Sequence, residues 1–394
     1  MSWIKHTGCT YHNQDTGYYC GAAADMMVLA EIGVPYSQLD QNDLYSSNHN
    51  HNQQPNWYSD PYGIRWTMNN RKPPGALGFV VYKPTTYEEG TRKIIDTIYE
   101  YNVAPIALVY GCMHWIVVAG VQTNVEPITD NYILEGFWIH NPVYHSPAPP
   151  PPHSASDGCG SGGITGTANE FVSQSYWEGN LFTGCNYDDP NGNLQYVSIC
   201  DPKPPRVPPP LPEGIRFKGL PDRLLDPEQV ISLSTASMER YRLDKDERVA
   251  PILQKDRVGE PQLVLRLDQP NTYYYILPWT TKEGATSLTA QIDARSGAFN
   301  SLQLREKSKS REFLSKKQAI ARVEKQRFTM LKRRRTIVFY PGVTQPVPTL
   351  VWRPCWESWS PHLPFYQFTL GNDTVYVRVD GQVFTELTTK GRGA

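Results

Sequence analysis

The chain has 394 residues, of which 39% are hydrophobic, 12% are aromatic and 34 are proline. This length exceeds the size at which a single core usually stops growing, and the apolar content excludes disorder throughout, so we expect two folded domains with long irregular connections. Because the sequence contains no run of about 18 apolar residues, we expect no membrane-spanning helix.

The net charge of −1 hides a strong asymmetry between the two halves. Residues 1–200 carry 7 basic and 18 acidic side chains, whereas residues 201–394 carry 31 and 21. We expect the basic half to dock on the acidic half; the alternative is an anionic partner of the basic half. The basic run Lys332–Arg335 is typical of a solvated face, so no nucleic-acid partner is expected.

The location of the protein and the state of its thiols stay open at this stage. The first 20 residues lack the apolar segment of a secretory signal, so the sequence as written indicates a cytoplasmic protein, or a secreted one if a signal peptide was removed. Its cysteines allow one free catalytic thiol beside buried thiols, or up to three disulfides. They are Cys9, Cys20, Cys112, Cys159, Cys185, Cys200 and Cys355.

The first predicted domain spans residues 1–200. A helix is expected from Cys20 to Ile32, because strong helix formers fill it and Gly33 and Pro35 follow. Alternating and apolar patterns predict the remaining elements. These are a helix at Tyr87–Tyr101, strands at Ala104–Tyr110, His114–Ala119 and Ile133–Ile139, a short helix at Ala168–Val172 and a strand at Leu194–Ile199.

Two proline-rich segments interrupt this pattern. Residues 146–163 read as a surface loop, and residues 201–214 read as a stiff linker that separates the domains. The second domain, residues 215–394, contains two similar units, 226–305 and 315–388. Each begins with helix-capping residues, continues with aromatic strands and ends in a tight turn, so a tandem duplication is expected.

Four residues in the first domain suggest a nucleophilic site. Cys20 lies at a predicted helix N-terminus, where the helix dipole favours a thiolate. His114 starts an apolar strand, where a polar ring requires a partner. Asn141 follows the next strand and could orient that ring. Gln14, six residues before Cys20, could donate to an oxyanion together with the Cys20 backbone N–H.

The ordered set of Gln14 and Cys20-Gly-Ala-Ala-Ala, then Met113-His114-Trp115, then Asn141-Pro142 resembles papain-like cysteine peptidases of the bacteriocin-leader (double-glycine) type. The resemblance covers roughly residues 8–200. It implies that Cys20 attacks the carbonyl, His114 transfers the proton, Asn141 orients His114 and Gln14 helps to form the oxyanion hole. It also implies a bacterial thiol hydrolase with a peptide or protein substrate and no metal or organic cofactor.

The second domain faintly resembles PepSY domains, which pair a helix with strands and carry a turn like Val377-Arg-Val-Asp-Gly381. Together these resemblances predict an α+β protein, with a papain-like domain followed by two PepSY-like units that restrain the peptidase. Cutting the chain at the 201–214 linker should then raise activity.

Several alternatives remain. The same four residues could serve an acyltransferase or an amidase, or the domain could be a degenerate peptidase that only binds. Cys112 and His114 share a strand face and could ligate a metal, although packing is the expected role of Cys112. The pair His49 and His51 is expected in a solvated loop rather than at a metal.

Overall fold

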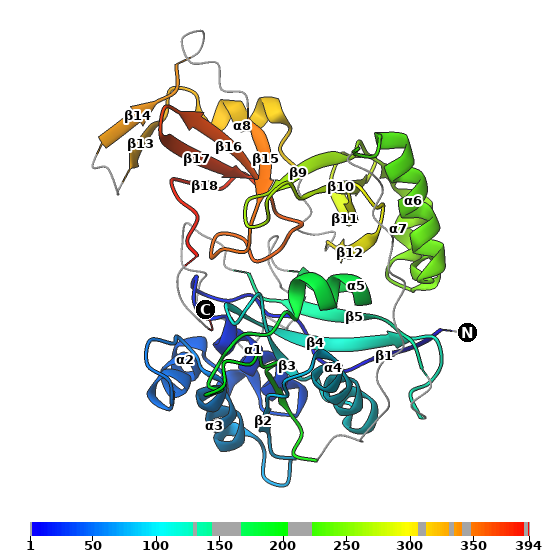
Figure 1. Ribbon diagram of the computed structural model, residues 1–394, viewed down its shortest axis with the longest axis vertical. Helices are drawn as coiled ribbons and strands as arrows, with labels where there is room; N and C mark the ends of the chain where they lie inside the picture. Colours follow the sequence, from blue (N-terminus) through cyan, green and yellow to red (C-terminus); the bar gives the residue numbers. More distant parts are fainter. Residues whose placement is uncertain are drawn as a thin grey trace. The chain divides into compact units, whose positions relative to one another are not determined.

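The computed structural model describes residues 2–128, 132–143, 167–203, 223–305, 313–330, 335–340, 348–389 and 393. They form a mixed α+β structure (Figure 1). The predicted loop at 146–163 and most of the predicted linker at 201–214 lie outside the described residues. No helix in the described part of the chain has the length and apolar character needed to cross a membrane.

The chain divides into two compact units. Unit 1 comprises Met1–Arg216 together with Asn300–Gln303 and Lys390–Ala394, and unit 2 comprises Phe217–Phe299 and Leu304–Thr389. The two short segments in unit 1 belong to the second domain in the sequence-based division. Unit 1 therefore includes residues from the middle and from the C-terminal end of the predicted second domain.

Unit 1 contains an antiparallel sheet in the order β6-β5-β4-β3-β7-β2, and β1 also pairs with β4. Residues Ser301 and Leu302, within Asn300–Gln303, pair with β6. The strands are β1 (Trp3–His6), β2 (Val80–Tyr82), β3 (Ile106–Val109), β4 (His114–Thr123), β5 (Leu134–Asn141), β6 (Thr167–Ser173) and β7 (Ser198–Cys200).

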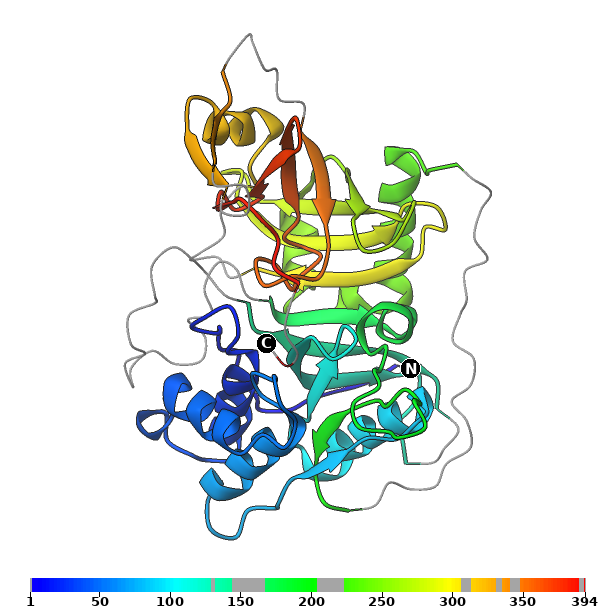
Figure 2. The same cartoon turned by 60° about the vertical axis from the view of Figure 1, so that its left-hand side comes forward.

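The helices of unit 1 pack around this sheet. Figures 1 and 2 show α1, α2 and α3 grouped in blue, with α4 set apart from them. Helix α1 contacts β4, α2 and α3, and it is buried from Cys20 to Leu29, so it runs through the core. The helices are α1 (Cys20–Glu31), η1 (Tyr36–Gln38), α2 (Gln41–Asn50), α3 (Pro61–Arg71), α4 (Tyr87–Asp96), η2 (Thr97–Tyr101), α5 (Gln174–Tyr176) and η3 (Trp177–Leu181).

Most predicted elements of unit 1 are confirmed, the predicted strand Leu194–Ile199 is confirmed only at its end, as β7, and two predictions are wrong. The segment Ala168–Val172 is part of strand β6 rather than a helix, because it pairs with β5. His49 and His51 do not lie in a solvated loop: His49 is in α2, and His51 caps its C-terminal end. Asp40 starts that helix by accepting two backbone N–H bonds.

Unit 2 is built from helices and a sheet with the strand order β18-β17-β16-β15-β9-β10-β11. Neighbouring strands of this sheet are antiparallel, except β15 and β9, which are parallel. Strands β13 and β14 form a separate antiparallel pair. Its helices are α6 (Pro227–Arg240), η4 (Leu243–Lys245), α7 (Ala250–Lys255) and α8 (Lys316–Val323). Its strands are β8 (Arg257–Val258), β9 (Gln262–Arg266), β10 (Tyr273–Thr280), β11 (Thr286–Asp293), β13 (Arg327–Met330), β14 (Arg335–Val338), β15 (Thr349–Trp352), β16 (Phe365–Leu370), β17 (Asp373–Arg378) and β18 (Val383–Phe384). Strand β12 (Phe299–Leu304) has its ends in unit 2.

The two halves of unit 2 repeat the same local contacts. Both α6 and α8 begin with a complete capping box. Leu225 donates its N–H to Ala294 O, and the Tyr275 hydroxyl donates to Leu225 O. In the second half, Leu314 donates to Val379 O, and the Tyr366 hydroxyl donates to Leu314 O.

A tandem duplication would produce such matched pairs, because each copy would keep the bonds that fix its helix on its sheet. The duplication itself stays a prediction.

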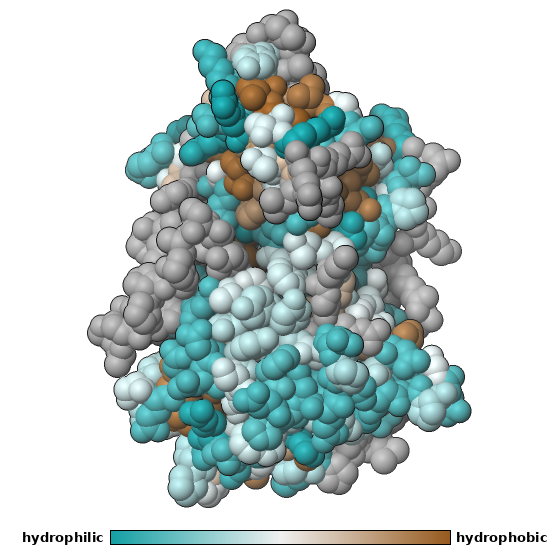
Figure 3. All heavy atoms as spheres, turned by 90° about the vertical axis from the view of Figure 1, so that its left-hand side faces the viewer, coloured by the Kyte–Doolittle hydropathy of each residue, from teal (hydrophilic) through white to brown (hydrophobic). Residues whose placement is uncertain are grey.

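On the face drawn in Figure 3, apolar side chains gather over unit 2, whereas the visible surface of unit 1 is mainly polar.

Candidate active site

Cys20 is the first residue of α1, and its side chain is 0% exposed. The first backbone N–H groups of an α-helix have no hydrogen-bond partner within the helix. Tyr19, at the N-cap position of α1, does not bond to them through its side chain. The backbone N–H of Trp115 donates to Cys20 Sγ at 3.3 Å. This bond places the sulfur beside the strand residue that follows His114.

Burial raises the pKa of the Cys20 thiol, and the backbone N–H groups of Trp115 and Gly21 only partly oppose this. The sequence led us to expect that the helix N-terminus would lower this pKa toward neutrality. In the structure the effect of burial is larger, and the pKa is raised. In the conformation described, Cys20 is fully buried, and this burial favours its neutral thiol form. A reactive thiolate requires either a proton acceptor or an opening of the site.

His114 and Asn141 meet because their strands are neighbours and run antiparallel. His114 begins β4 and Asn141 ends β5, so the two residues lie at the same end of the sheet. His114 Nε2 and Asn141 Oδ1 are 2.8 Å apart, and both side chains are almost fully buried. Since the amide oxygen only accepts, this bond places a proton on Nε2 and makes Nδ1 the basic nitrogen of the neutral ring.

Gln14 lies in the loop that leads to α1 and is buried. Its side-chain amide donates to Thr16 O at 2.7 Å, and its Oε1 has no hydrogen-bond partner. The structure thus bonds His114 to Asn141, and it bonds Cys20 to Trp115, the residue that follows His114, whereas the hydrogen bond of Gln14 goes to its own loop. A contribution of Gln14 to an oxyanion hole stays a prediction.

The turn before His114 is held in an unusual backbone conformation. Tyr110, Gly111 and Cys112 have φ values of 53°, 63° and 68°, in the left-handed region. For Tyr110 and Cys112 such a conformation costs on the order of 1 kcal/mol or more, so other contacts must stabilise it.

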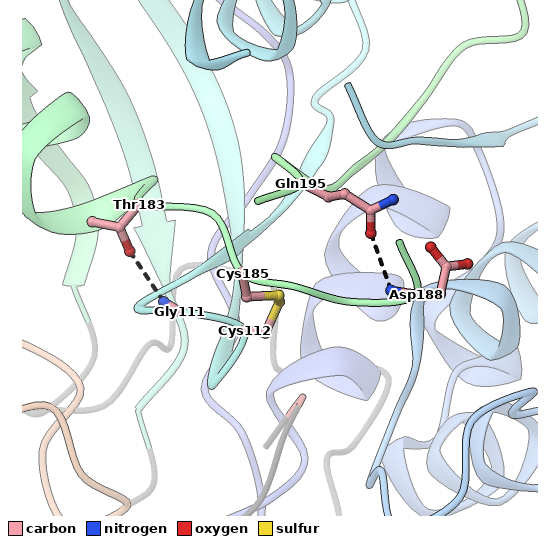
Figure 4. The surroundings of a disulfide bond; sticks show 6 residues. All are labelled: Gly111, Cys112, Thr183, Cys185, Asp188 and Gln195. Carbon is pink, nitrogen blue, oxygen red and sulfur yellow. Dashed lines mark hydrogen bonds between the residues drawn. A yellow bond between two sulfur atoms is a disulfide. The ribbon is translucent and has the colours of Figure 1, made fainter. Parts of the chain in front are cut away.

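Bonds from the last residue of η3 and from the segment that follows it provide these contacts (Figure 4). Cys112 forms a disulfide with Cys185. Gly111 donates its N–H to Thr183 Oγ1 at 3.2 Å, and Tyr110 donates to Leu181 O at 2.9 Å. This segment therefore fixes the turn that precedes the histidine.

The disulfide corrects the prediction that Cys112 serves packing. It also removes the thiolate that a metal pair with His114 would need. Within the described residues there is no group of three or more His, Cys, Asp or Glu side chains that could hold a metal. Of the basic run Lys332–Arg335, only Arg335 lies in the described part, and it forms an ion pair with Asp373.

Ser59 and Trp115 complete the surroundings of Cys20. Ser59 immediately precedes Asp60, the N-cap of α3, and its carbonyl accepts the Trp115 Nε1–H at 3.0 Å. Both residues are fully buried. The position of Trp115 beside His114 in the sequence could have pointed to the tryptophan, whereas no local pattern distinguishes Ser59.

Asp25 is a buried acid on α1 whose position the sequence did not single out. Its side chain is 0% exposed, and its Oδ2 accepts from Asn48 Nδ2 at 2.6 Å, whereas Oδ1 has no partner. Burial raises the pKa of Asp25 well above its ordinary value of 3.8. The carboxyl group is therefore favoured in its neutral form in the folded protein.

This pKa predicts the pH dependence of stability. The folded state holds the proton of Asp25 more tightly than the unfolded state does. The contribution of this proton to the free energy of unfolding is therefore fully present below pH 3.8 and is lost as the pH rises toward the folded pKa. Asp25→Asn, which cannot ionise, should therefore gain stability relative to the native chain between pH 4 and pH 8. Urea unfolding of both proteins across this range measures it. A constant difference would contradict a raised pKa.

The comparisons with known proteins do not assign a family. No family model matches the chain, and no curated protein matches it. One solved structure, the Bacillus megaterium YpeB C-terminal domain, is similar over 78% of this chain and 100% of the other, at 8% identity and a TM-score of 0.19. A likeness this weak supports no argument about fold or function, so both resemblances stay predictions.

Proposed function

We propose that this chain is a cysteine peptidase that hydrolyses peptide bonds through Cys20, His114 and Asn141. The observation that carries the proposal is the 2.8 Å hydrogen bond between His114 Nε2 and Asn141 Oδ1. The residue that follows His114 is Trp115, and its backbone N–H donates to Cys20 Sγ. A nucleophile at a helix N-terminus, a base on an adjacent strand and a group that orients the base are the parts that covalent catalysis requires. The papain-like and PepSY-like arrangement of the two units belongs to the same proposal.

The chemistry follows from this arrangement. His114 Nδ1 takes the proton from Cys20 Sγ, and the thiolate attacks the substrate carbonyl carbon. The Cys20 backbone N–H and the Gln14 amide stabilise the oxyanion. His114 returns the proton to the leaving amine, which leaves a thioester on Cys20. Water, deprotonated by His114, then attacks the thioester and releases the acid, and the thiol regains its proton.

Asn141 supports these steps without reacting. It accepts the Nε2 proton, which keeps the imidazole in the tautomer and orientation that expose Nδ1 to the thiol. An amide carries no charge, so it stabilises imidazolium less than a carboxylate would. We therefore expect Asn141 to act mainly by positioning the ring.

Product identification tests the proposal. The intact protein is incubated with a peptide library and, separately, with small amides and acyl acceptors, and the products are analysed by mass spectrometry. Peptide cleavage that is lost in Cys20→Ala supports a peptidase. Cleavage of small amides alone, or transfer of the acyl group to an acceptor, would make the chain an amidase or an acyltransferase. Absence of all three activities would contradict catalysis.

A further inference from the structure

A pocket of about 310 Å³ lies within unit 2, at the ends of the two parallel strands of its sheet. Strands β9 and β15 are paired (Figure 1), and the residues that directly follow them, Leu267 and Arg353, both line the pocket. The Leu267 N–H donates to Trp352 O at 2.8 Å, which holds the two strand ends together. Since a water molecule occupies about 30 Å³, this volume suits a ligand of about ten non-hydrogen atoms.

Arg353 is the basic residue among those that line the pocket. Its Nε is buried and has no hydrogen-bond partner in the part of the chain that the structure describes. The ion pairs of the described residues do not include it either. A buried donor without a partner costs free energy, and the guanidinium fork matches the geometry of a carboxylate. An anionic ligand would therefore satisfy Arg353.

Two other arginines of unit 2 show how a buried arginine of this sheet is satisfied within the chain. Arg266 and Arg378 each donate two hydrogen bonds, at 2.6 to 3.1 Å, to the aspartate that lies two residues further on. The residue at the same distance from Arg353 is Cys355. The local sequence thus gives Arg353 no carboxylate, whereas it gives one to each of the others.

The acids on the wall of the pocket restrict the kind of anion. Asp373 is 2% exposed and accepts from Arg335 Nε at 2.6 Å, so its charge is already paired. Glu386, in the segment after β18, also lines the pocket. Two carboxyl groups beside the site repel a phosphate dianion more strongly than a monoanion, because the repulsion grows with the charge. The pocket therefore favours a carboxylate over phosphate.

Tyr376 and three apolar side chains complete the part of the wall that a ligand would contact. Burial raises the pKa of Tyr376, and the nearby Arg353 guanidinium opposes this effect. The phenol therefore stays protonated at neutral pH and can donate to the anion that Arg353 binds. Leu267, Met330 and Leu387 supply apolar surface for a short hydrocarbon group.

We propose that this pocket binds a small monocarboxylate, with its carboxylate on Arg353 and a short apolar group against Leu267, Met330 and Leu387. The ligand is either a free acid or the last residue of a peptide, since both present the same carboxylate. All the residues involved lie in unit 2, so the proposal does not rest on the proposed peptidase function.

Nuclear magnetic resonance of protein that contains isotope-labelled arginine tests binding at this residue. The Nε–H signal of Arg353 is assigned by its absence from Arg353→Lys. N-acetylalanine should shift this signal until the site is saturated. N-acetylalaninamide has the same shape without the charge and should leave it unchanged. Inorganic phosphate should bind about tenfold more weakly than N-acetylalanine, or less tightly still.

A charge-removing variant provides a second measurement, by calorimetric titration with N-acetylalanine. Arg353→Gln should raise the Kd about tenfold or more, because the charge-assisted hydrogen bonds to the carboxylate are lost. Arg257→Gln is the matched control, because it removes the same charge from an exposed residue of unit 2 outside the pocket. It should leave the Kd unchanged. The spectra of the native chain remain decisive if Arg353→Gln folds poorly.

A longer probe separates the two sources of the carboxylate. If N-acetyl-tetra-alanine binds more tightly than N-acetylalanine, the ligand is a peptide end; if it binds more weakly or equally well, the ligand is a free acid. Phosphate that binds as tightly as N-acetylalanine would overturn the choice of a carboxylate. A Kd that Arg353→Gln does not change, or no response to any probe, would overturn the site. If Glu386→Gln shifts the signal and no probe does, Glu386 is the counter-ion of Arg353 and the proposal is wrong.

Discussion

Replacing His114→Ala should lower kcat/KM for peptide hydrolysis by about 10³-fold or more, because the neutral thiol of Cys20 then has no proton acceptor. Burial already raises the pKa of this thiol, so a thiolate at neutral pH depends on its partner. The same variant should slow the alkylation of Cys20 and move its onset to higher pH. Rates of hydrolysis and alkylation measured from pH 5 to pH 9 in the native chain and in the variant test both effects.

Variants of Asn141 provide the control for this result. Asn141→Asp keeps an acceptor for His114 Nε2 and adds a charge that favours imidazolium, so the alkylation profile should move to lower pH. Asn141→Ala removes the acceptor and should reduce kcat more than it changes KM. If Cys20 reacts with iodoacetamide no faster than the other free cysteines, and His114→Ala leaves its rate unchanged, the proposed pair of Cys20 and His114 does not exist.

Among the changes proposed for this protein, removing the Cys112–Cys185 disulfide should produce the largest loss of free energy of unfolding. The Cys112–Cys185 bond closes a loop of 73 residues, for which chain entropy predicts a contribution of about 4 kcal/mol. Without it, the left-handed turn at Tyr110–Cys112 loses its covalent support, and the position of His114, which follows this turn, is less constrained. The double variant Cys112→Ser/Cys185→Ser should therefore unfold at clearly lower urea concentration and hydrolyse peptides more slowly.

Reductant distinguishes the disulfide from a simple packing effect. Dithiothreitol should shift the urea midpoint of the native chain toward that of the double variant, and it should leave the double variant unchanged. Cys200→Ser, at a buried free cysteine, is the matched control and should still respond to reductant. A native midpoint that does not respond to full reduction would contradict a stabilising disulfide.

The sequence by itself determined the elements whose signals are local. Alanine-rich sequence and a following glycine predicted α1 beginning at Cys20, and capping residues predicted α6 beginning after Asp226 and α8 after Ser315. Polar residues at the start of one apolar strand and just after the next pointed to His114 and Asn141, and the structure places His114 Nε2 2.8 Å from Asn141 Oδ1. These predictions hold because helix propensity, capping and strand periodicity depend on neighbouring residues.

The tertiary structure decided what depends on distant residues. Ala168–Val172 has the composition of a short helix but becomes a strand, because β5 provides its backbone partners. Cys112 pairs with Cys185, and not with another cysteine, only because folding brings together segments that are far apart in the sequence. The raised pKa values of Cys20 and Asp25 have the same origin, since burial is a property of the packed core and not of the local sequence.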